Sequence, residues 1–259
     1  MRWKMVRIGV VLFALYCGFK AVPVERASSG DITSTSIRYV ALGDSIAYGY
    51  GLEDREEQSY VSLIRKHLEK QYDSVFVSNF GSNGMRSEEL LDILINPENE
   101  FYAKYRATIK HADIVTISIG SNDLLHLIKL DMNIESLIEN GAEMFDKACR
   151  GFQKNFPKII REIRKINPNV KIYADNIYNP AKGLAAFDDV YDVAEYYISL
   201  MNHCFYESED YRLVDVKGCF DQEKDSMVNV SWKGREIDPH PSEEGHQKIA
   251  GMVIKEMER

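Results

Sequence analysis

The chain lacks the positive charge that a polyanionic partner would require. Its 259 residues hold 32 lysines and arginines against 40 aspartates and glutamates, a net charge of −8. It also has no basic run with interleaved aromatic residues. Because a protein that binds a phosphate backbone needs a basic face, we expect no nucleic-acid partner.

Cysteine is scarce, with four residues and no C-x-x-C spacing, so the sequence offers no zinc site. We expect neither a metal nor another cofactor. Cys17 lies near the N-terminus, which leaves Cys149, Cys204 and Cys219. Cys204 and Cys219 flank a short segment and can pair in an oxidising compartment, and the alternative is three buried thiols. The residues leave both alternatives open.

An apolar run long enough to cross a membrane is also lacking at the N-terminus. The run Ile8–Phe19 is about a dozen residues long, the length of a signal-peptide core, and it follows three basic residues. We expect residues 1–22 to form a signal peptide or a membrane anchor and residues 23–36 a polar spacer. The protein is then exported, and is either secreted or tethered on the outer face of the cytoplasmic membrane.

What the chain does contain is an alternation of strand-like and helix-like segments. The strongest strand is 113–119, whose nearly continuous apolar run is typical of a parallel strand covered on both faces. The other expected strands are 39–42, 74–80, 170–174 and 211–216. The main expected helices are 59–71, 102–110, 142–165, 190–204 and 242–257. The alternation predicts one α/β domain, residues 37–259, with about five parallel strands between layers of helices.

Three of these strands end in short polar or glycine-containing turns, which are Gly43-Asp44-Ser45, Gly81 to Gly84 and Gly120 to Asp123. In a parallel sheet the three turns meet at one edge, where open α/β sheets bind their ligands. Ser45 can act as a nucleophile there. Its own N–H, the N–H of Gly84 and the amide of Asn122 can serve as donors to a developing oxyanion. Each residue taken alone is also an ordinary turn or cap residue.

A base for this serine is found near the C-terminus. His240 lies between two prolines in an expected loop before the last helix, and Asp238 is near enough to accept a hydrogen bond from its imidazole. His246, within that helix, is the competing histidine. We favour His240 because of the flanking prolines and the adjacent acid.

These four blocks together resemble those of the SGNH, or GDSL, hydrolase family, and the similarity covers nearly all of residues 37–259. The resemblance implies a flavodoxin-like three-layer α/β/α sandwich and a metal-independent serine ester hydrolase. It also implies Ser45 as nucleophile, His240 as base, and an oxyanion hole of Ser45, Gly84 and Asn122. The family usually places its acid three residues before the histidine, where this chain has Ile237. Either Asp238 or the Ile237 carbonyl therefore orients His240.

The substrate remains open between a lipid or lysophospholipid acyl ester and an O-acetylated carbohydrate. Tyr48, Tyr50, Tyr178 and Phe187 can line a site for either, although any one of them can equally be a packing residue. A different class of function is a non-catalytic cell-surface carbohydrate-binding module on the same fold. The presence of a complete set of reactive residues favours the esterase or lipase.

Overall fold

The computed structural model describes residues 35–129, 134–183, 188–206, 210–230 and 237–259. All of them belong to one unit of the chain, Ser34–Arg259. The predicted signal peptide or anchor lies outside these residues, as does the spacer apart from its end. None of the described helices is both long and apolar enough to cross a membrane.

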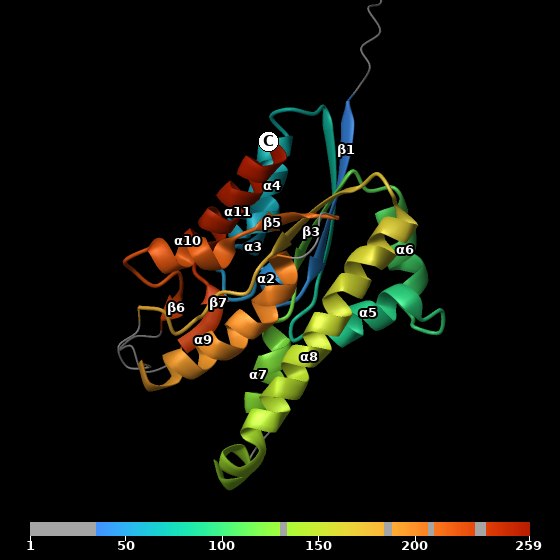
Figure 1. Ribbon diagram of the computed structural model, residues 1–259. Helices are drawn as coiled ribbons and strands as arrows, with labels where there is room; N and C mark the ends of the chain where they lie inside the picture. The colour runs from blue at the N-terminus through green and yellow to red at the C-terminus, as the bar shows by residue number, and fades with distance from the viewer. Residues whose placement is uncertain (1–34, 130–133, 184–187, 207–209, 231–236) are drawn as a thin grey trace, which may run out of the picture. The chain divides into compact units, whose positions relative to one another are not determined.

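The main sheet has five parallel strands in the order β2-β1-β3-β4-β5 (Figure 1). The strands are β1 Ser36–Gly43, β2 Ser74–Gly81, β3 Ile114–Ser118, β4 Lys171–Asp175 and β5 Arg212–Val214. This is the strand order of flavodoxin-like folds. The predicted parallel sheet and fold class are therefore confirmed.

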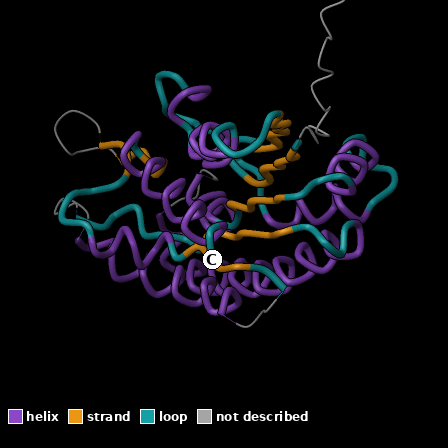
Figure 2. Tube along the Cα trace, turned by 90° about the horizontal axis from the view of Figure 1, so that it is seen from above, coloured by secondary structure: helices purple, strands orange, loops and turns teal. Residues whose placement is uncertain are grey.

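Helices cover the sheet on both sides. They are α2 Ser45–Tyr48, α3 Arg55–Gln58, α4 Tyr60–Leu68, α5 Ser87–Ile95, α6 Tyr102–Lys110, α7 Ser121–Lys129, α8 Ile134–Ile166, α9 Asp188–Asn202, α10 Val216–Gln222 and α11 Glu243–Met257, with a 3₁₀ turn at His203–Tyr206. Figure 2 shows the strands between the two helical layers.

The alternation of side chains along β1 explains the three layers. Val40 and Leu42 join a buried cluster built with α5, α6, α8 and α9. Tyr39 and Ala41 point the other way, into a second cluster built with α4, α10 and α11. Both faces of β1 are therefore apolar, as a central parallel strand requires.

Among the differences from the prediction, two concern α8 and the segment that carries His240. The helix expected over residues 142–165 begins earlier, at Ile134. The segment that carries His240 is not a loop: it forms a strand, β7 Ile237–Pro241, which pairs antiparallel with β6 Val228–Val230. Prolines flank His240, but a strand at the edge of a two-stranded sheet tolerates proline because few of its N–H groups need a partner.

The described cysteines are thiols, and no disulfide joins Cys204 to Cys219. The Cys204 Sγ instead donates a hydrogen bond to the Met201 carbonyl at 3.1 Å. The sequence left open a Cys204–Cys219 disulfide or unlinked thiols, and the structure contains the unlinked thiols.

Candidate active site

Ser45 is presented by an abrupt turn at the end of β1. Gly43 has a φ of +135°, and a Cβ there would lie 1.9 Å from the Ser118 carbonyl oxygen of β3. Only glycine allows this approach of the two strands. Asp44 then caps α2, since its Oδ1 accepts a hydrogen bond from the Ile46 N–H at 2.9 Å. Ser45 is consequently the first residue of a short helix, with its hydroxyl at the carboxyl edge of the sheet.

The imidazole of His240 reaches this hydroxyl from the other end of the chain. His240 Nε2 lies 2.8 Å from Ser45 Oγ. Asp238 Oδ1 contacts His240 Nδ1 and also accepts the His240 backbone N–H at 3.2 Å. A carboxylate on Nδ1 requires the proton to be on that nitrogen, so Nε2 is the acceptor and the Ser45 hydroxyl donates to it.

The segment around His240 is held in place by neighbouring side chains. Tyr178, which is buried, donates its hydroxyl to the Pro239 carbonyl at 2.6 Å. Asn229 Nδ2 lies 3.4 Å from the second carboxyl oxygen of Asp238. The local order of the His–Asp pair therefore depends on contacts from β6 and from the loop after β4.

The two remaining turns lie beside that of Ser45. In the sheet register Gly43 is opposite both Gly81 and Ser118, so β1, β2 and β3 end level with one another. Asn122 is buried, and its Nδ2 donates to the Met85 carbonyl at 3.2 Å, next to Gly84. Because an amide nitrogen carries two hydrogens, one remains for another acceptor.

Gly84 is required for its backbone conformation rather than for space. Its φ is +81°, a region that side chains disfavour, yet no described atom lies within 4 Å of the position that a Cβ would take. The space beside Gly84 is open among the described residues, so a side chain there would be disfavoured by the backbone conformation and not by a neighbouring atom.

The two candidate histidines are clearly separated. His246 is fully buried in the second core cluster, where its Nδ1 accepts the Tyr60 N–H at 3.2 Å and burial lowers its pKa to about 4. Among the described residues, no hydrogen bond joins His246 to Ser45 or to Asp238. The histidine that contacts the Ser45 hydroxyl is therefore His240.

Of the four aromatic residues considered for the substrate site, Tyr50 contacts the ring of His240. The ring of Tyr50 lies 4.5 Å from the imidazole of His240, and 46% of Tyr50 is exposed. Tyr48 lies beneath the Arg55 guanidinium at 4.2 Å, and Phe187 falls outside the described residues.

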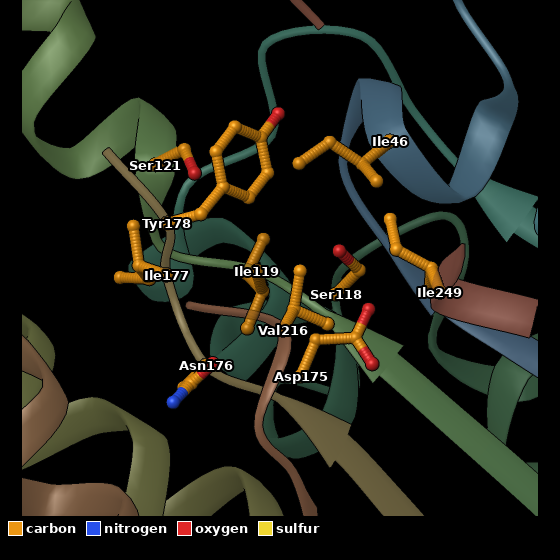
Figure 3. A pocket seen from close by; sticks show the side chains of 10 residues that line it. All are labelled: Ile46, Ser118, Ile119, Ser121, Asp175, Asn176, Ile177, Tyr178, Val216 and Ile249. Carbon is orange, nitrogen blue, oxygen red and sulfur yellow. The ribbon is translucent and has the colours of Figure 1, made fainter. Parts of the chain in front are cut away.

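Sequence reasoning missed two buried acids that interact with each other, Asp44 in the turn before Ser45 and Asp175. Asp175, at the end of β4, lines a cavity of about 10 Å³ with Ser118 and Val216, and its carboxyl turns toward Ser118 (Figure 3). Burial, together with the nearby Asp44 carboxyl, raises the pKa of Asp175 to about 8, and burial raises the pKa of Asp44 to about 7. An aspartate as the last residue of an apolar strand was the available signal.

Within the part of the chain that the structure describes, no three His, Cys, Asp or Glu side chains are grouped so as to hold a metal ion. The chemistry available from the described geometry is that of a hydroxyl with an oriented imidazole and nearby amide donors. That arrangement is suited to attack on a carbonyl carbon.

Comparison with known proteins gives relatives along most of the chain. The model of the GDSL-like lipase/acylhydrolase family matches residues 41–248. The uncharacterized protein YpmR of Bacillus subtilis is 28% identical over 88% of this chain and 84% of its own length. The spore germination lipase LipC of Bacillus licheniformis is 23% identical over 83% of this chain and 93% of its own.

Solved structures with the same fold include two lipolytic enzymes. The lipase Lip_vut3 from a goat rumen metagenome has a TM-score of 0.66 and 24% identity, covering 85% of this chain and 96% of its own. Phospholipase A1 from Streptomyces albidoflavus has a TM-score of 0.61 and 16% identity, covering 86% and 99%. At these identities the likeness shows the fold.

Proposed function

This chain belongs to the GDSL-like lipase/acylhydrolase family, and from that premise we propose that it is an exported serine ester hydrolase that works through an acyl-enzyme. Family membership supports hydrolysis of esters. The observation that carries the mechanism is the 2.8 Å separation between Ser45 Oγ and His240 Nε2. A general base must be within this reach of the proton that it removes.

The reaction has two steps. His240 Nε2 takes the Ser45 hydroxyl proton while Oγ forms a bond to the ester carbonyl carbon, and Asp238 stabilises the resulting imidazolium. The same proton passes to the alcohol oxygen as its bond to the carbonyl carbon breaks, which leaves Ser45 acylated. Water, deprotonated by His240, then attacks the acyl carbon. The bond from that carbon to Ser45 Oγ breaks, His240 returns the proton to Oγ, and the acid leaves.

The negative charge on the carbonyl oxygen is assigned to three donors: the N–H groups of Ser45 and Gly84 and the side-chain amide of Asn122. The hydrogen bond from Asn122 to Met85 supports this assignment, because it anchors the amide next to the Gly84 turn. Donors fixed in advance are effective because they need no reorganisation as the charge develops.

The substrate is proposed to be a small acyl ester, of a lipid or of an acetylated carbohydrate. Solved structures with this fold include a phospholipase A1 and an acetyl xylan esterase, which act on these two classes. The Asp238 contact to Nδ1 favours the carboxylate over the Ile237 carbonyl as the group that orients His240. Export rests on the basic and apolar residues at the N-terminus, and fractionation of cells that make a C-terminally tagged chain would test it.

The test of the mechanism is Ser45→Ala, with Ser199→Ala as control because Ser199 is an exposed serine on α9. We expect Ser45→Ala to abolish hydrolysis of a short-chain aryl ester and labelling by a fluorophosphonate probe. The circular dichroism spectrum of Ser45→Ala should match that of the unmodified chain. Ser199→Ala should retain both ester hydrolysis and labelling by the probe. Near-normal turnover by a folded Ser45→Ala protein would rule the mechanism out.

A further inference from the structure

We propose that Tyr50 is the surface on which the alcohol part of the ester lies, and that it selects alcohols that carry a ring. This inference rests on the proposed function and deepens it, since it assigns one side of the site to the leaving group. It draws on the loop that follows the nucleophile, residues 49–51, and on its contacts with His240.

The backbone of this loop packs closely against its neighbours. Gly49 and Gly51 both have positive φ, of 84° and 85°, and they flank Tyr50. The Tyr50 N–H donates to the Ser45 carbonyl at 3.0 Å. At Gly51 a Cβ would lie 2.8 Å from the Asn229 amide and 3.2 Å from an Asp238 carboxyl oxygen. The backbone on either side of Tyr50 is thereby fixed against the nucleophile and against the His–Asp pair.

The side chain of Tyr50 contacts the His240 imidazole and is otherwise partly exposed among the described residues. Its ring contacts the His240 imidazole, with the ring centres 4.5 Å apart and the planes tilted by 46°. Nearly half of the residue, 46%, is nevertheless exposed. An aromatic ring held on one side and open on the other offers a preformed surface at little entropic cost.

The chemistry places the leaving group on this side of the site. His240 Nε2 must return the proton to the alcohol oxygen, so that oxygen has to lie within hydrogen-bond reach of the imidazole. The carbonyl oxygen points toward the other loops, which carry Gly84 and Asn122. A group attached to the alcohol oxygen therefore leaves the reaction centre beside His240, on the side of the site where the partly exposed Tyr50 contacts the imidazole. The face of an aryl or sugar ring can stack there, whereas a linear alkyl chain makes a poorer contact.

The experiment compares esters that share one acyl group. Because benzyl acetate and hexyl acetate both give an acetyl-enzyme, deacylation is common to them, and they differ in the presence of a ring in the alcohol. We expect Tyr50→Ala to lower kcat/KM for benzyl acetate about 2- to 10-fold more than for hexyl acetate, the range expected for one aromatic contact. A methyl glucoside monoacetate should follow benzyl acetate. Tyr50→Phe, which keeps the ring, should keep the preference.

Phe76→Ala is the matched control, because Phe76 is an exposed aromatic on β2 that contacts Arg38. Its ratio of the two kcat/KM values should equal that of the unmodified chain. If Tyr50→Ala lowers kcat/KM equally for all the esters, Tyr50 only orients His240 and the inference is overturned; no change in either value overturns it as well. Activity in Ser45→Ala would instead defeat the proposed mechanism, so the two failures are distinguishable.

Discussion

Replacing Asp175 by asparagine should change how the stability of the protein depends on pH. Asp175 is 5% exposed, and its carboxyl oxygens are buried with no hydrogen-bond partner among the described residues. The Asp44 carboxyl lies near enough to raise the pKa of Asp175. Burial raises its pKa from 3.8 to about 8. Asparagine has nearly the same shape and does not ionise.

The sign follows from where the proton is held. Between pH 4 and pH 8 the folded chain keeps the proton on Asp175 while the unfolded chain releases it, so the free energy of unfolding falls as the pH rises. The largest slope for one group is about 1.4 kcal/mol per pH unit, so the loss between pH 5 and pH 8 is at most about 4 kcal/mol. Asp175→Asn should remove it.

Urea denaturation followed by circular dichroism at pH 5, 6, 7 and 8 measures the effect. The difference in unfolding free energy between the two proteins should grow steadily from pH 5 to pH 8, in favour of the variant. Glu100→Gln is the control, because Glu100 is exposed and its removal should leave the curve parallel to that of the unmodified chain. Parallel curves for Asp175→Asn would show that Asp175 is already ionised in the folded state at pH 5.

Three further substitutions address the site. Asp238→Asn should lower kcat about 10²- to 10⁴-fold in steady-state assays with little change in KM, because the charge that holds the His240 tautomer is lost. A kcat within a few fold of that of the unmodified chain would indicate that the Ile237 carbonyl orients His240 instead. Asn122→Ala should lower kcat about 10²- to 10³-fold. Its fluorophosphonate labelling should be slowed but not abolished, and an unaltered kcat would remove this amide from the oxyanion hole. Gly43→Ala should lower the melting temperature by many degrees, because the added Cβ meets the Ser118 carbonyl at 1.9 Å; an unchanged thermal transition would contradict the close approach of β1 and β3.

The layered fold was predictable because its signals are local. Strand β3 is buried at every residue, and the sequence Ile114–Ser118 shows this directly as an almost unbroken apolar run. The boundaries of α6 were also predicted correctly at both ends, Tyr102 and Lys110. Periodicity of two or 3.6 residues acts over neighbours in the chain, so no knowledge of distant contacts is needed.

Short elements escaped prediction for a physical reason. Helices α2 and α3 have four residues each, too few for a periodic apolar pattern, and they are held by the caps of Asp44 and Asp54. Strand β7 was hidden by its prolines, since its pairing with β6 depends on tertiary contact and not on strand propensity. The burial of Asp44 and Asp175 was not predicted for the same reason, because the residues around Asp175 do not indicate that helices will cover its side chain.

The candidate site depends both on local sequence signals and on contacts between segments far apart in the chain. The turn at Ser45 can be read from sequence because the glycine and the capping aspartate that build it are adjacent to it. The 2.8 Å contact with His240 cannot, because it joins residues 195 positions apart through a small antiparallel sheet outside the main one. The main sheet therefore determines where Ser45, Gly84 and Asn122 lie. The β6–β7 pair, held by Tyr178 and by the loop around Gly51, determines whether His240 reaches Ser45. The proposed activation of Ser45 thus depends on the part of the fold whose local sequence signal is weakest.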